Sequence, residues 1–168
     1  LTQTAVRNFQ RQQGLIVDGI VGSQTWGKLN NLHKSDSSKP GNDKPENSGF
    51  NVIQLVADAG SLTGTPYVWG GTTPSGFDCS GFLVYVFNKQ GVKLPRTVAE
   101  QWNFGKKVSQ PSVGDVVFFA TTHSGPSHNG IYVGNNQFIH SGSSTGVTVS
   151  DLNSSYWKSR YLGARQLY

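Results

Sequence analysis

The residues of this chain that could perform chemistry are its single cysteine, Cys79, and two of its four histidines, His128 and His140. A thiol becomes an effective nucleophile when a histidine accepts its proton and a further group holds that imidazole in one orientation. An isolated cysteine is also one of the most buried residue types, so an inert place in the core is the alternative. A metal site built from the same side chains is disfavoured, because paired ligand motifs such as CxxC or HExxH are absent.

The stretch before Cys79 predicts that this residue begins a helix. Glycines and prolines between Thr65 and Asp78 permit turns and an extended approach, and Asp78 is a favourable N-cap residue. The apolar run 82–87 that follows could equally be a buried strand, but its length and the stop at Gly91 favour a helix. A thiol in the first turn would face unpaired N–H groups and the positive end of the helix dipole. We therefore expect the thiolate form to be stabilised.

The two histidines are expected on neighbouring strands. His128 opens the strand read from GIYVG, and His140 closes the strand read from QFIH. The turn signal at 134–136, Gly-Asn-Asn, predicts an antiparallel hairpin that brings both rings close together. A register slip of one residue would turn one ring to the wrong face. The other two histidines, His33 and His123, match no motif and are expected in linker and loop segments.

The rest of the chain predicts an α+β fold. A helix is expected in Phe50–Gly60, and a second begins at Thr97, where Glu100 completes a capping box. Trp102 is interpreted as a packing residue. The segments that follow are short, β-branched or aromatic and interrupted by turn residues, as antiparallel strands are: DVVFFA, GIYVG, QFIH, GVTVSDL and YLGARQLY. Helices followed by strands indicate the α+β class.

Several separated motifs, taken together, resemble the NlpC/P60 family of cell-wall cysteine peptidases. They are YVWGGTTPSGFDCSGFLVYVF, LPRT (Leu94–Thr97), GDVVFF (Gly114–Phe119), HNGIYVG (His128–Gly134) and FIH (Phe138–His140). The resemblance implies a papain-like fold and hydrolysis of peptidoglycan stem peptides, commonly between D-isoglutamate and a diamino acid. It supports Cys79 as nucleophile, His128 as base and later acid, and His140 as the group that orients His128.

The resemblance also implies substrate contacts and a setting for the enzyme. Tyr67, Asp78, Ser80 and Arg96 occupy positions that would contact the amino end and backbone of the stem peptide. Asp78 could instead act only as a helix cap, and Tyr67 only as a packed ring. We expect no cofactor, a monomer, and a secreted, wall-associated protein whose partners are stem peptides and the bacterial cell wall.

The chain divides into three predicted parts. Residues 1–32 resemble the second half of a small three-helix peptidoglycan-binding repeat, with a first helix that stops at Gly14 and a second that begins at Ser23. A short anchor packed on the larger domain is the alternative. Residues 33–49 have no apolar side chain and are predicted to be a flexible linker. Residues 50–168 form the predicted peptidase domain.

Composition excludes some classes of function. The net charge of +5 is spread along the chain without a basic block, so nucleic-acid binding is disfavoured, while attraction to an anionic wall polymer is reasonable. No apolar run reaches the roughly 18 residues of a membrane span, and no leader is apparent.

Two alternatives to the endopeptidase hypothesis remain at this point. The same fold and residues could serve an amidase that cuts the N-acetylmuramoyl-L-alanine bond. The domain could also be a non-catalytic wall-binding module that only holds stem peptides.

Overall fold

The computed structural model describes residues 49–168 and, before them, Arg7, Gln10, Arg11, Gly14 and Val17. The chain divides into two compact units, Leu1–Glu46 and Asn47–Tyr168. In the first unit, Arg7, Gln10 and Arg11 are helical, and Gly14 lies in a turn with a φ of 66°. The predicted helix from Ser23 and all of the predicted linker except Gly49 lie outside the described residues.

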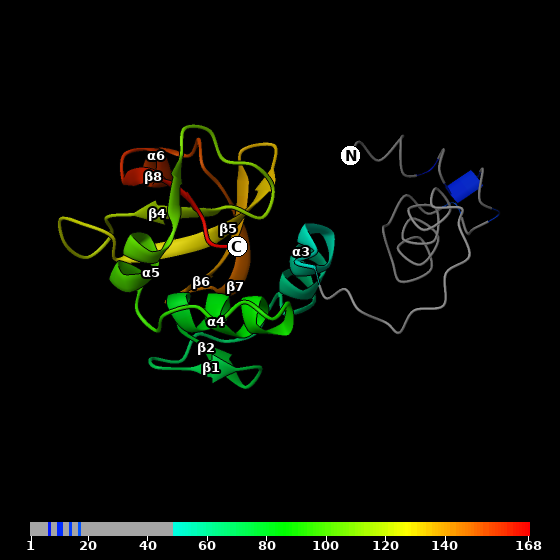
Figure 1. The fold of residues 1–168 in the computed structure, drawn as a ribbon, viewed down its shortest axis with the longest axis horizontal. Helices are drawn as coiled ribbons and strands as arrows, with labels where there is room; N and C mark the ends of the chain where they lie inside the picture. The colour runs from blue at the N-terminus through cyan, green and yellow to red at the C-terminus, as the bar shows by residue number, and fades with distance from the viewer. Residues whose placement is uncertain (1–6, 8–9, 12–13, 15–16, 18–48) are drawn as a thin grey trace. The chain divides into compact units, whose positions relative to one another are not determined.

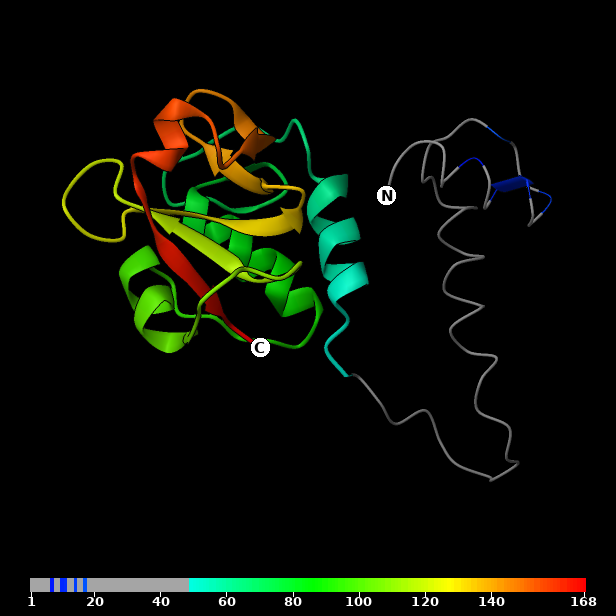
Figure 2. The same cartoon turned by 90° about the horizontal axis from the view of Figure 1, so that it is seen from above.

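The second unit has the predicted α+β architecture (Figures 1 and 2). Its elements in chain order are α3 (Val52–Ser61), β1 (Thr72–Thr73), β2 (Gly76–Phe77), α4 (Cys79–Lys89), α5 (Val98–Phe104), β3 (Lys106–Val108), β4 (Val116–Phe119), β5 (His128–Gly134), β6 (Gln137–Gly142), β7 (Gly146–Asp151), α6 (Ser155–Lys158) and β8 (Tyr161–Gln166). The large sheet has the order β3-β8-β4-β5-β6-β7, and every neighbouring pair in it is antiparallel. The five strands predicted from the sequence are therefore confirmed, whereas the short elements β1, β2, β3 and α6 were missed.

Helices α4 and α5 begin where the sequence predicts, because their N-terminal caps are made. Asp78 accepts a hydrogen bond from Gly81 N at the start of α4, and the chain leaves this helix through Gly91 with a φ of 77°. At the start of α5, both hydrogen bonds of the Thr97–Glu100 capping box are present. The apolar run after Cys79 is thus a helix and not a strand.

Helix α4 lies between the two sheets (Figure 1). On one side its apolar face packs with α3 and residues of β4, β5 and β6 in the main core, which includes Phe82, Val86, Phe118 and Ile131. On the other side it contacts the β1–β2 hairpin at Gly81, where a Cβ atom would collide with the carbonyl oxygen of Gly71. Glycine at this position is what allows the hairpin to approach the first turn of α4.

A second, smaller core lies against alternate residues of the same strands. It contains Val117, Phe119, Phe138 and Ala164, with Trp157 packed at its margin. Because side chains alternate along a strand, neighbouring residues of β4 belong to different cores. This second core is the one that supports the two histidines described below.

Trp102 is a packing residue, as predicted. Its ring meets Phe118 edge to face with a centroid distance of 5.2 Å, and the guanidinium of Arg165 lies 3.5 Å from its centroid. This contact joins α5 to β4 and β8.

Candidate active site

Cys79 is the first residue of α4 and is half-buried. Burial, together with the neighbouring Asp78 carboxylate, raises the pKa of its thiol to about 11, although the backbone N–H groups of Ser80 and Cys79 act in the opposite direction. The prediction that the helix start would favour the thiolate is therefore wrong for the free protein. The N–H groups do reach the sulfur, but the loss of water around it and the nearby negative charge outweigh them.

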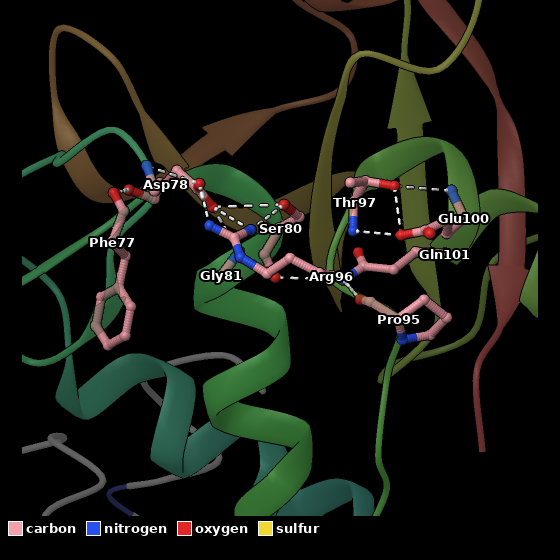
Figure 3. A network of polar contacts seen from close by, with 11 residues as sticks. Phe77, Asp78, Ser80, Gly81, Pro95, Arg96, Thr97, Glu100 and Gln101 are labelled. Carbon is pink, nitrogen blue, oxygen red and sulfur yellow. Dashed lines mark hydrogen bonds and ion pairs between the residues drawn. The ribbon is translucent and has the colours of Figure 1, made fainter.

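The Asp78 carboxylate, one residue before the cysteine, is fully engaged (Figure 3). It accepts hydrogen bonds from Gly81 N at 2.7 Å and Gly70 N at 3.0 Å, which hold the helix start and the preceding loop together. Arg96 forms a bidentate ion pair with it, at 2.5 Å and 3.1 Å, and also donates to Ser80 Oγ at 2.9 Å. Asp78 is thus both a helix cap and an ion-pair partner. The LPRT segment places Arg96 at the start of α4.

Tyr67 belongs to the same group of residues. Burial, followed by the influence of Cys79 and Asp78, raises the pKa of its phenol. The hydroxyl therefore stays protonated at neutral pH and is available as a hydrogen-bond donor. The structure brings Cys79 together with four residues that were named from the sequence: Tyr67, Asp78, Ser80 and Arg96.

The two histidines are brought together on the β5–β6 hairpin. His128 Nε2 lies 2.9 Å from His140 Nδ1, and His140 Nε2 lies 2.9 Å from Ser150 Oγ on β7. The turn between the strands has positive φ at both Asn135 and Asn136, as the predicted two-residue hairpin turn requires. The arrangement is a relay of three side chains on adjacent strands, with Nδ1 of His128 at its free end.

The histidine pair is neutral in the free protein. Burial, together with the neighbouring His140, lowers the pKa of His128 to about 3. Burial also lowers the pKa of His140 to about 4. A neutral His128 with its proton on Nε2 donates to His140, which in turn donates to Ser150, so one tautomer satisfies both hydrogen bonds.

Trp157, on α6, covers this pair. Its ring stacks on His128 with a centroid distance of 5.2 Å and an interplanar angle of 24°, and it meets His140 edge to face at 4.9 Å. Trp157 also contacts Phe119 and Phe138 of the second core. The indole therefore limits rotation of His128 and keeps water from it.

Buried amides connect the strand of His128 to the helix of Cys79. Asn129, next to His128, donates to Gln101 Oε1 at 2.6 Å, and Gln101 Nε2 donates to Pro95 O at 2.8 Å and Ser80 O at 3.3 Å. Gln101 and Asn129 are both 0% exposed. Within residues 49–168 no hydrogen bond joins the Cys79 sulfur to His128. This amide relay is therefore one polar connection between the two halves of the site, and the hydrogen bond from Ser141 Oγ to Phe77 O at 2.9 Å is another.

Sequence reasoning missed Ser150, Trp157, Gln101 and Asn129. Ser150 could have been found from strand alternation, because β7 pairs with β6 in a register that places Ser150 opposite Phe138, two residues from His140. The other three carry no local signal, since their roles depend on which elements pack together.

Two further absences apply to the described part of the chain. No three His, Cys, Asp or Glu side chains among the described residues lie close enough together to hold a metal ion. In the same residues, every helix is too short or too polar to cross a membrane.

Comparison with known proteins gives two family matches. The sequence profile of the NlpC/P60 family matches residues 64–166, and that of a putative peptidoglycan binding domain matches residues 1–29. One relative is the probable peptidoglycan endopeptidase LytE of Bacillus subtilis, 60% identical over 119 residues, which are 71% of this chain and 35% of that protein. Another is the murein DD-endopeptidase MepS/murein LD-carboxypeptidase of Escherichia coli K12, 40% identical over 140 residues, or 80% of this chain and 74% of that protein.

A solved structure extends the likeness to three dimensions. The crystal structure of an NlpC/P60 family protein from Bacillus cereus superposes with a TM-score of 0.65 at 32% identity, covering 70% of this chain and 40% of that one. The chain thus spans about a third of the length of LytE and most of the length of MepS.

Proposed function

Because the chain belongs to the NlpC/P60 family and carries a peptidoglycan-binding domain at its N-terminus, we propose that it is a cysteine endopeptidase that hydrolyses peptidoglycan stem peptides. The observation that carries the proposal is that one domain holds both a cysteine at a helix start and a buried His128–His140–Ser150 relay, and the relatives of this domain are named as endopeptidases. The bond we propose is the one between D-isoglutamate and the diamino acid.

The proposed reaction begins from a neutral thiol and a neutral imidazole. As the Cys79 sulfur attacks the scissile carbonyl carbon, the thiol proton moves to His128 Nδ1, the free end of the relay. The imidazolium that forms keeps its Nε2–H on His140, which fixes the ring and stabilises its charge. Hydrogen-bond distances between such partners commonly shorten only when substrate is bound.

Collapse of the tetrahedral intermediate completes the first half of the reaction. His128 returns the proton to the leaving amine as the carbon–nitrogen bond breaks, and the acyl group stays on Cys79 as a thioester. Water then attacks the thioester, giving its proton to His128, and the thiol and a new carboxylate are released. The backbone N–H of Cys79 is the proposed donor to the oxyanion, with the Tyr67 hydroxyl as a second donor.

The acyl side of the substrate is assigned to the group around Asp78. We propose that the Asp78 carboxylate binds the ammonium of the stem peptide and that Tyr67, Ser80 and Arg96 line the same site. In the free protein Arg96 neutralises Asp78, so an ammonium must share this carboxylate with the guanidinium. Residues 1–29 are proposed to hold the enzyme on the wall, in a secreted, wall-associated protein.

The experiment is mass spectrometry of muropeptides after digestion of purified wall by wild type, Cys79→Ala, His128→Ala and His140→Asn. We expect cleavage at the D-isoglutamyl bond by wild type, no cleavage by the first two variants, and a residual rate from His140→Asn, whose amide can still accept the His128 hydrogen bond. Release of intact stem peptides from muramic acid would support the amidase alternative instead. Wall binding without any cleavage by wild type would support the non-catalytic alternative.

A further inference from the structure

A shallow, open surface hollow of about 490 Å³ lies outside the group around Asp78. It is lined by the loop that joins β4 to β5, which includes Thr121, Thr122, His123 and Ser124, and by Ser159 and Arg160 at the end of α6. In both ribbon views this loop projects next to α6 and the start of β8 (Figures 1 and 2). Hydroxyl groups, an imidazole and a guanidinium therefore share one concave surface.

The loop is held in shape by its own hydrogen bonds. The Ser127 hydroxyl accepts from Thr121 N at 2.8 Å and Thr122 N at 3.2 Å, and it lies 3.4 Å from Phe119 O. Ser127 directly precedes His128 in the sequence. The hollow is thus formed by a closed loop anchored next to the proposed catalytic base.

Arg160 is the positive charge of this hollow, and its position is fixed. Its guanidinium lies 4.0 Å from the centroid of the Tyr156 ring, and Nη1 donates to Tyr156 O at 2.9 Å and Ser159 Oγ at 3.1 Å. Within residues 49–168 the ion pairs are Lys89–Asp58 and Arg96–Asp78, so Arg160 has no carboxylate partner there. A positioned guanidinium without an acid, among hydroxyl groups, is suited to bind a carboxylate.

The hollow lies near the start of the strand that carries His128. Ala120 N donates to Arg160 O at 2.9 Å, directly after the pair formed by Phe119 and His128. Arg160 follows Trp157, which stacks on His128, by three residues. Because His128 is the proposed proton donor to the leaving amine, the proposed function brings the amino acid that carries this amine to the same part of the domain.

We propose that this hollow binds a carboxylate of the leaving diamino acid, with Arg160 as the principal contact and the loop hydroxyls as supporting donors. The inference rests on the proposed function, because it assigns the amine-side product to a site that shares no residue with the acyl-side group around Asp78. Specificity for the diamino acid then depends on Arg160, and specificity for the acyl part on Asp78 and its neighbours.

The test compares two synthetic stem tripeptides, L-alanyl-γ-D-glutamyl-diaminopimelate and the same peptide with its diamino-acid carboxylates converted to carboxamides. The full chain is used as wild type, Arg160→Gln and Arg165→Gln. The last is a matched control, since it removes an arginine that also stacks on an aromatic ring but does not line the hollow. Thermal unfolding of each variant establishes that it is folded.

We expect Arg160→Gln to lower kcat/KM about 10- to 100-fold for the carboxylate substrate, as loss of a charge-assisted hydrogen bond implies, and less than about 3-fold for the carboxamide. Arg165→Gln should behave as wild type with both. Equal effects of Arg160→Gln on the two substrates would overturn the proposal, as would equal kcat/KM values of wild type for them.

A binding measurement separates failure of this inference from failure of the proposed function. Calorimetric titration with free diaminopimelate needs no hydrolysis, and we expect weaker binding by Arg160→Gln than by wild type or Arg165→Gln. If wild type cleaves neither peptide but this difference is seen, the endopeptidase proposal fails and the carboxylate site stands. Equal affinity of all three proteins would overturn the carboxylate site.

Discussion

The buried amide of Gln101 should be necessary for both the stability and the activity of this domain, and Gln101→Ala tests this. The side chain makes three hydrogen bonds, to Asn129, Pro95 and Ser80, and is fully buried. Removing it deletes all three, each with a net value of about 1 kcal/mol. It also leaves Asn129 Nδ2 without its acceptor, beside an Oδ1 that is already buried without a partner.

The expected loss in the free energy of unfolding is therefore about 4–5 kcal/mol, from about 3 kcal/mol for the three hydrogen bonds together with roughly 1–2 kcal/mol for the newly unsatisfied donor. Urea denaturation of wild type and variant measures this difference. Asn103→Ala is the matched control, since Asn103 is an exposed amide on the same helix, and it should change stability by less than about 0.5 kcal/mol.

The effect on catalysis follows from what Gln101 joins. It links the strand of His128 to the first turn of the helix of Cys79, so its loss should lower kcat at a temperature where the variant is still folded. A misplacement of about 1 Å between reacting groups can cost on the order of 100-fold in rate. The double variant Gln101→Ala with Asn129→Ala should lose less stability than the sum of the two single variants, because the partners share one hydrogen bond.

The reasoning is refuted if Gln101→Ala costs less than about 1 kcal/mol, or no more than Asn103→Ala. It is also refuted if the variant is destabilised as expected but retains the full kcat, because the amide relay would then be structural only. Strict additivity of the Gln101 and Asn129 variants would show that their hydrogen bond contributes nothing measurable.

Two further predictions concern ionisation. The rate of alkylation of Cys79 by iodoacetamide in the free protein should rise with a midpoint near pH 11, the pKa that is set chiefly by burial. Asp78→Asn should move this midpoint to lower pH, because it removes a neighbouring negative charge. A wild-type midpoint at or below pH 9 would contradict this prediction. Acid should destabilise the fold below about pH 6.5, because the unfolded chain then binds protons that the buried, neutral His128 and His140 do not. A shift in the pKa of His140 to about 4 corresponds to about 3 kcal/mol of folding stability lost at pH 4. The urea midpoint of His140→Asn should therefore decline less between pH 6.5 and 4 than that of wild type. Parallel declines of the two proteins would refute the prediction.

The sequence by itself determined those features that depend on neighbouring residues in the chain. Asp78 and the Thr97–Glu100 pair predicted helix starts because capping is a contact over three residues. The Gly-Asn-Asn turn predicted the hairpin, and with it the approach of His128 to His140, because a tight turn and strand alternation together set the register. The motifs also sufficed to indicate the family.

Only the tertiary structure decided how the site is supported and ionised. Burial of Cys79 reversed the expected stabilisation of its thiolate, since desolvation depends on what packs around a helix start and not on the helix itself. Ser150, Trp157 and the Gln101–Asn129 pair come from four separate elements and meet the catalytic candidates only after the sheet and helices have packed. Strand alternation gives a signal for Ser150 alone. The other contacts leave none in the sequence, because each joins residues that are distant along the chain and close only in space.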